Sequence, residues 1–101
     1  MPAAYWVNTF REVRDPARLA AYAEAAGSVM ETYGGRFLAR GMPAAVFEEA
    51  PMERTTVIEF PSVERAVEAY ESAEYQAALA VLGDGAVRDI RIVPAVGDGG
   101  G

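Results

Sequence analysis

Residues 54–62 read Arg-Thr-Thr-Val-Ile-Glu-Phe-Pro-Ser, and this stretch decides the kind of fold that the chain can adopt. Threonine, valine, isoleucine and phenylalanine favour extended backbone, so we expect a strand over residues 54–60. Side chains alternate between the two faces of a strand. One face therefore carries Thr56, Ile58 and Phe60, and the other carries Thr55, Val57 and Glu59. Apolar side chains stand on both faces.

The residues before this strand predict a helix with well-marked ends. Asp15 can cap its start, and Pro16 suits the first helical position because its missing N–H is not needed there. Gly34-Gly35 ends the helix, since glycine takes the left-handed conformation without a steric penalty. The apolar stripe between these ends consists of Leu19, Tyr22, Ala23, Ala26, Met30 and Tyr33.

The remaining elements complete one fold pattern. We expect strands over residues 4–10, 36–40 and 86–93, the second interrupted at residues 41–43 and resuming over residues 45–48. A second helix starts after Ser62 and is split where Ser72 restarts it. The order β-α-β-β-α-β predicts an α+β, ferredoxin-like fold with a four-stranded antiparallel sheet and its helices on one face. We expect a single domain over residues 1–96 and a disordered glycine-rich tail over residues 97–101.

Helices on one face leave the other face of such a sheet uncovered. The first strand carries Trp6 and Phe10 on one face and Tyr5 and Val7 on the other, and the last strand carries Ile90 and Ile92 on one side and Val87 and Val93 on the other, so apolar residues occur on both faces. Because large exposed apolar patches are rare on monomers, we expect a homodimer formed through the sheet faces. The alternative is a monomer that tolerates scattered valine and tyrosine on its surface.

Composition excludes several classes of chemistry. The chain has 101 residues, of which 51% are hydrophobic, and a formal net charge of -6, so we expect no nucleic-acid partner. It contains no cysteine, histidine or lysine, which removes thiol nucleophiles, Cys/His zinc sites, His-ligated haem and Schiff-base chemistry. We therefore expect no cofactor and no metal site.

Hydropathy gives an expectation about location. No stretch approaches the roughly 20 consecutive apolar residues that cross a bilayer. The first residues, Met-Pro-Ala-Ala-Tyr-Trp, lack the basic start and apolar core of a signal peptide. We expect a cytoplasmic protein with no membrane partner.

Four segments resemble one known family. Residues 33–41, Tyr-Gly-Gly-Arg-Phe-Leu-Ala-Arg-Gly, resemble the most recognisable stretch of the bacterial domain-of-unknown-function family numbered 1330. Residues 57–62, 69–72 and 74–76 fit the same pattern at the same relative positions, whereas residues 42–45 depart from it. The family is similar to the dimeric α+β barrel superfamily, in which two ferredoxin-like protomers pack sheet against sheet. Relatives in that superfamily include cofactor-free monooxygenases, lactone isomerases and haem enzymes.

Glu59 is the candidate catalytic residue. It lies inside a β-branched strand between Ile58 and Phe60. A buried, unpaired carboxylate has a raised pKa and can act as a general base. The alternative is that Glu59 forms an ion pair with Arg36 or Arg40 on a neighbouring strand.

The candidate ligand-binding residues are Asn8, Arg36, Arg40, Tyr70 and Tyr75. Arg36 and Arg40 are four apart, which in a regular strand puts both on one face, where they could clamp an anion or form ion pairs. Asn8 stands among aromatic residues and could orient a ligand or satisfy a backbone group. Tyr70 and Tyr75 could line a cleft between helix and sheet, or belong to the core with a wet hydroxyl.

Two functions remain open at this stage. One is a dimeric domain that binds a small organic molecule in a pocket between helices and sheet. The other is a cofactor-independent enzyme, similar to a monooxygenase or an isomerase, that uses a buried glutamate with arginine and tyrosine. The surroundings of Glu59 distinguish them.

Overall fold

Strands and helices alternate in the order that the sequence predicts. A computed structural model describes residues 2–97. Its elements are β1 (Ala4–Val13), α1 (Pro16–Thr32), β2 (Arg36–Gly41), β3 (Thr55–Phe60), α2 (Val63–Glu71), α3 (Ala73–Leu82) and β4 (Ala86–Pro94). Of the predicted tail over residues 97–101, residues 98–101 lie outside the described residues.

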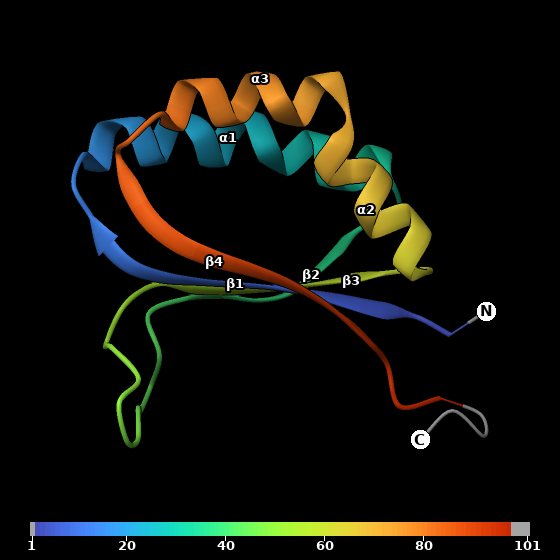
Figure 1. Cartoon of the computed structure of the whole chain (residues 1–101), viewed down its shortest axis with the longest axis horizontal. Coiled ribbons are helices and arrows are strands. Elements are labelled where there is room, and N and C mark those ends of the chain that lie inside the picture. Colours follow the sequence, from blue (N-terminus) through green and yellow to red (C-terminus); the bar gives the residue numbers. More distant parts are fainter. Residues whose placement is uncertain (1, 98–101) are drawn as a thin grey trace.

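The four strands form one antiparallel sheet in the order β2-β3-β1-β4. All three helices lie over one face of this sheet, and the other face has no helix over it (Figure 1). The ferredoxin-like fold is therefore confirmed. The faces also alternate as predicted: Trp6 and Phe10 of β1 are buried under the helices, whereas Tyr5 and Val7 are only half-buried on the open face.

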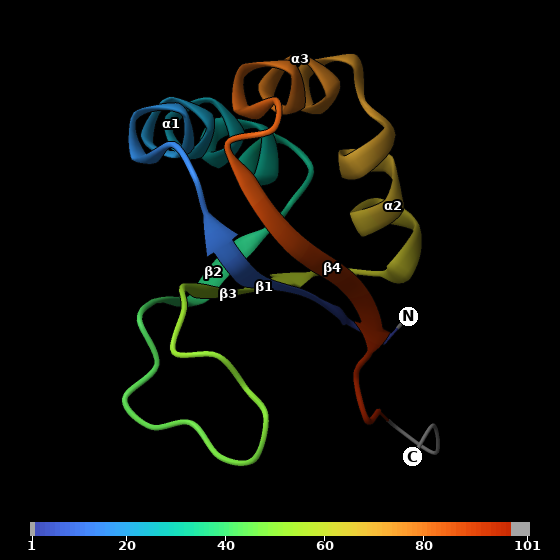
Figure 2. The ribbon, with the colours of Figure 1, turned by 60° about the vertical axis from the view of Figure 1, so that its left-hand side comes forward.

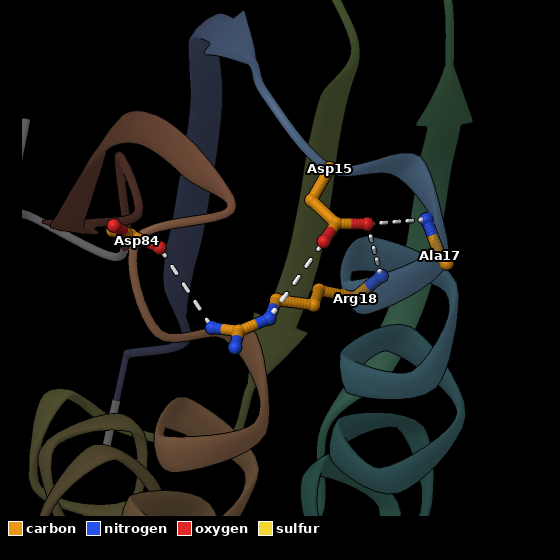
Figure 3. Close-up of polar contacts among 4 residues, drawn as sticks. All are labelled: Asp15, Ala17, Arg18 and Asp84. Atoms are coloured by element: carbon orange, nitrogen blue, oxygen red, sulfur yellow. Dashed lines mark hydrogen bonds and ion pairs between the residues drawn. The ribbon is translucent and has the colours of Figure 1, made fainter.

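The capping residues fix where the helices begin. Asp15 Oδ1 accepts hydrogen bonds from the backbone N–H groups of Ala17 at 3.1 Å and Arg18 at 3.2 Å (Figure 3). The Arg18 guanidinium lies 3.7 Å from carboxylate oxygens of both Asp15 and Asp84, and so joins the start of α1 to the turn before β4. The same arginine thus ties together two chain segments that are far apart in sequence.

Ser72 splits the second helix as predicted. Its extended backbone (φ -65°, ψ 150°) ends α2 and begins α3. Its hydroxyl donates to the Ala69 carbonyl at 2.8 Å and accepts from the Tyr75 N–H at 3.1 Å. The helical direction changes here, so α3 runs beside α1 while α2 descends toward β4 (Figure 2).

Two predictions about the second strand are wrong. The strand does not resume over residues 45–48, because residues 42–54 form a long loop on the side of the sheet away from the helices (Figures 1 and 2). The second wrong prediction is that Arg36 and Arg40 lie on one face of a regular strand. The register of β2 against β3 shifts between Phe37 and Ala39. This bulge at Leu38 changes which face the later residues occupy.

The join between α1 and β2 leaves no room for a side chain at Gly35. A Cβ built there lies 2.9 Å from the Met30 carbonyl oxygen, 2.9 Å from the Phe60 ring and 3.0 Å from Ile58. Gly27, in the middle of α1, has no such neighbour within 4 Å.

We therefore expect opposite effects from the same substitution at these two glycines. Gly35→Ala should lower the free energy of unfolding by about 1–3 kcal/mol, because the core must shift to admit the methyl group. Gly27→Ala should raise it by about 0.5–1 kcal/mol through helix propensity. Urea denaturation of the two variants beside the wild type measures both. Equal effects would contradict the close packing at Gly35.

Candidate functional site

The structure distributes the predicted site residues over four separate places. Asn8 and Arg40 line a small cavity between α1 and the sheet. Tyr70 lines a larger groove on the other side of the core, between α2, α3 and β4. Arg36 and Glu59 lie on the open face of the sheet, and Tyr75 is buried in the core.

Arg36 and Arg40 do not share a face, contrary to the prediction. Arg36 stands opposite Glu59 in the register, on the open face, whereas Arg40 stands opposite the buried Thr56 on the helix face. The bulge at Leu38 adds one residue to β2 between them, which reverses the alternation. The two guanidinium groups therefore cannot hold one anion together within a single chain.

Glu59 is paired. An N–H of the Arg36 guanidinium donates to its carboxylate at 2.8 Å, and the two side chains are 73% and 28% exposed respectively. Glu59 thus forms the ion pair that the sequence offered as an alternative, and its carboxylate is partly exposed. An exposed pair of this kind contributes little to stability.

Asn8 is the polar residue of the small cavity. The side chain is buried, at 4% exposure, and its Oδ1 has no hydrogen-bond partner among the described residues. The amide oxygen therefore serves no neighbouring backbone group among the described residues. Arg40, Arg54 and Thr56 also line this cavity, which has a volume of about 40 Å³. That volume admits a water molecule rather than an organic ligand.

The groove beside β4 is much larger. Its volume is about 720 Å³, and its walls come from α2, α3 and one side of β4. Apolar side chains dominate these walls: Val67, Leu79, Leu82, Val87, Ile90 and Ile92. Ligand sites for small organic molecules have this size and this apolar character.

Arg88 is the cation of this groove, and the sequence interpretation missed it. Its guanidinium donates to the Tyr22 hydroxyl at 2.8 Å and to the Tyr75 hydroxyl at 3.0 Å. It also stacks on the Tyr22 ring, with its central carbon 4.5 Å from the ring centroid. A signal was present, because Arg88, Ile90 and Ile92 alternate along one face of β4, where the first of them breaks an apolar row.

Tyr75 holds Arg88 from within the core. Its side chain is fully buried, and its hydroxyl lies 2.6 Å from that of Tyr22. Burial raises the pKa of Tyr75 far above its ordinary value, so the phenol stays neutral and serves as a fixed acceptor for the guanidinium. Although burial by itself disfavours the charged form of Arg88, the two hydroxyls outweigh it, and the pKa of Arg88 is raised. Arg88 is thus a permanent positive charge in the groove wall.

These features define an α+β protein of the ferredoxin-like class with a ligand-sized groove between its helices and its edge strand. The family model described as a domain of unknown function (DUF1330) matches residues 3–96, and the chain belongs to this family. No curated protein matches the chain.

Solved structures share the fold. A protein of unknown function from Rhodopseudomonas palustris, RPA0582, is 23% identical over 93% of this chain and 81% of its own, with a TM-score of 0.69. SnoaB, a cofactor-independent oxygenase from Streptomyces nogalater, is 11% identical over 97% of each chain, with a TM-score of 0.68. A dimeric protein of unknown function and ferredoxin-like fold from Bacteroides fragilis is 12% identical over 92% of this chain and 96% of its own, with a TM-score of 0.62. At these identities the likeness concerns the fold alone.

None of the helices in residues 2–97 is long and apolar enough to span a bilayer. The described residues also contain no cluster of three acidic side chains that could hold a metal ion.

The unsatisfied oxygen of Asn8 gives a direct prediction. Replacing Asn8 by the similarly shaped leucine removes a buried acceptor that makes no hydrogen bond, and such an acceptor costs about 1–3 kcal/mol. We therefore expect Asn8→Leu to unfold at the same temperature as the wild type or a few degrees higher, as calorimetry would measure. A clear fall in the unfolding temperature would mean that the amide has a partner, such as a bound water molecule.

Proposed function

We propose that this protein is a small homodimer that binds a small organic molecule in the groove between α2, α3 and β4. The proposal rests on the groove. Its volume is about 720 Å³, its walls are mostly apolar, and its lining residues include a single arginine, Arg88. Pockets for organic ligands combine these properties, a large apolar surface with few polar groups that fix the orientation of the ligand.

The groove suits such a ligand better than the Asn8 cavity does. At about 40 Å³ the cavity beside Asn8 and Arg40 is more than ten times smaller than the groove. Of the predicted ligand-binding residues, Tyr70 contributes directly to the groove wall, and Tyr75 contributes through its bond to Arg88. Arg36 and Glu59 lie on the opposite face of the sheet, so their positions do not favour the alternative of an enzyme that uses Glu59 as a base.

The open face of the sheet supports the dimer. On the face without helices, Val7 stands opposite Val57 and Tyr5 stands opposite Val93, while Arg91 and Glu59 are their other neighbours in the register, so the apolar side chains form two adjacent pairs beside charged ones. Val93 is 46% exposed in the single chain. A second copy that packs on this face would remove that surface from water. A protein of this fold from Bacteroides fragilis is described as dimeric, which supports the proposal of a dimer.

The dimer can be tested by light scattering. At micromolar concentration we expect about twice the mass of the 10.8 kDa chain. Val57→Asp should give the mass of one chain, because association would bury a carboxylate against apolar side chains. Val81→Asp, at an exposed valine of α3, is the control and should remain dimeric. A wild-type protein with the mass of one chain would refute this part of the proposal.

The groove can be tested by filling it. Val67 lines the groove from α2, and Val67→Trp should occupy part of its volume. We expect millimolar 2-naphthol and 2-naphthoate to raise the unfolding temperature of the wild type, since a ligand of the native state stabilises it. This shift should be lost in Val67→Trp and kept in Val81→Trp, whose side chain lies outside the groove. Equal shifts in the two variants would place binding elsewhere.

A further inference from the structure

Arg88 occupies an unusual position for a charged residue. It is half-buried on the helix face of β4, in register with the buried Phe10. No carboxylate of the described residues lies within 4.0 Å of its guanidinium, and the same is true of Arg40, Arg54 and Arg91, of which Arg40 and Arg91 are exposed to solvent. A half-buried cation with only neutral neighbours loses hydration without gaining a counter-charge.

The geometry of the guanidinium leaves it able to bind an anion. Arginine has five N–H donors in a planar fork. The hydrogen bonds to Tyr22 and Tyr75 use two of them, and they fix the plane of the group together with the stacking on the Tyr22 ring. An arginine held in this way loses little further entropy when it binds a planar anion such as a carboxylate.

The surroundings of Arg88 restrict what is attached to that anion. The groove continues from Arg88 along Ile90 and Ile92 of β4, and Leu79 and Val67 of the helices face it. These side chains offer no charge and favour an apolar body. The one acidic residue of the lining is Glu71, an exposed side chain at the end of α2.

We infer that the ligand of the groove is a carboxylate joined to an apolar or aromatic body, with the carboxylate on Arg88. This inference rests on the proposed function, since it names the class of ligand for the same groove. The apolar body gains from leaving water, and the carboxylate supplies the counter-charge that the described residues do not give to Arg88.

The test compares two probes that differ in one group, 2-naphthoate and 2-naphthol, titrated calorimetrically into the full-length protein at pH 7. We expect the naphthoate to bind at least ten-fold more tightly. In Arg88→Gln the naphthoate should lose about ten- to a hundred-fold in affinity, the range for a lost charge-assisted pair, while naphthol binding stays within about two-fold. Retained naphthol binding also shows that the variant is folded.

Glu71→Gln supplies a matched change of charge in the same groove. It should tighten naphthoate binding and affect naphthol binding much less, because it removes a negative charge that acts on the charged probe and leaves Arg88 in place. It also gives a charge-altered variant in which the bonds of Arg88 to the two tyrosines are intact.

The outcomes distinguish a wrong ligand class from a groove that binds no organic ligand. Equal affinities of the two probes in the wild type, or an unchanged preference for naphthoate in Arg88→Gln, would overturn the carboxylate inference and leave the groove as a binding site. Failure of both probes to bind would overturn the proposed function as well. A changed mass of Arg88→Gln in light scattering would assign the groove to contact between copies and overturn the inference. If Arg88→Gln does not fold, the comparison of the two probes in the wild type still decides.

Discussion

The arrangement of this protein depends on one constraint, that a sheet has two faces and all three helices cover the same one. Burial of Trp6, Phe10, Ile58 and Phe60 under the helices supplies the core of the single chain. Strict alternation then forces Val7 and Val57 to the other face. The same pattern that folds the chain therefore leaves apolar side chains on the face without helices, and the groove occupies space between helices and sheet.

Aromatic packing divides that space into two unequal parts. Trp6 and Tyr75 meet edge to face, with ring centroids 5.3 Å apart, and Tyr22 contacts Tyr75 in the same way at 6.0 Å. The Asn8 cavity lies under α1, and the groove opens under α2 and α3. Arg88 stands beside this aromatic cluster, where the two hydroxyls bind it. Arg88 thus lines the larger space, whereas Arg40 and Arg54 line the smaller one.

Local chemistry made most of the fold predictable from the sequence. The caps at Asp15 and Ser72 and the alternation in residues 54–60 each follow from a few neighbouring residues, and the structure has all of them. The bulge at Leu38 has no comparable signature, since it depends on how β2 matches β3, and it separates Arg36 from Arg40. The candidate site was harder to predict from the sequence than the fold. Arg88 acquires its setting from Tyr22 and Tyr75, which are 66 and 13 residues away in the chain. Only tertiary structure brings these residues together.

The split at Ser72 links the fold to the groove. An unbroken helix over residues 63–82 would present one stripe to the sheet, with its start and end on a common line. Because Ser72 ends α2 and caps α3 with one hydroxyl, the two segments take different directions. Val67 and Tyr70 then face the groove from α2, and Leu79 and Leu82 face it from α3. The groove walls thus come from two helix faces at an angle, and the break between them is spanned by the hydrogen bonds of Ser72 and by the one that Gln76 donates to the Tyr70 carbonyl. The position of β4 at the edge of the sheet, with no strand beyond it among the described residues, leaves the groove open to solvent on that side.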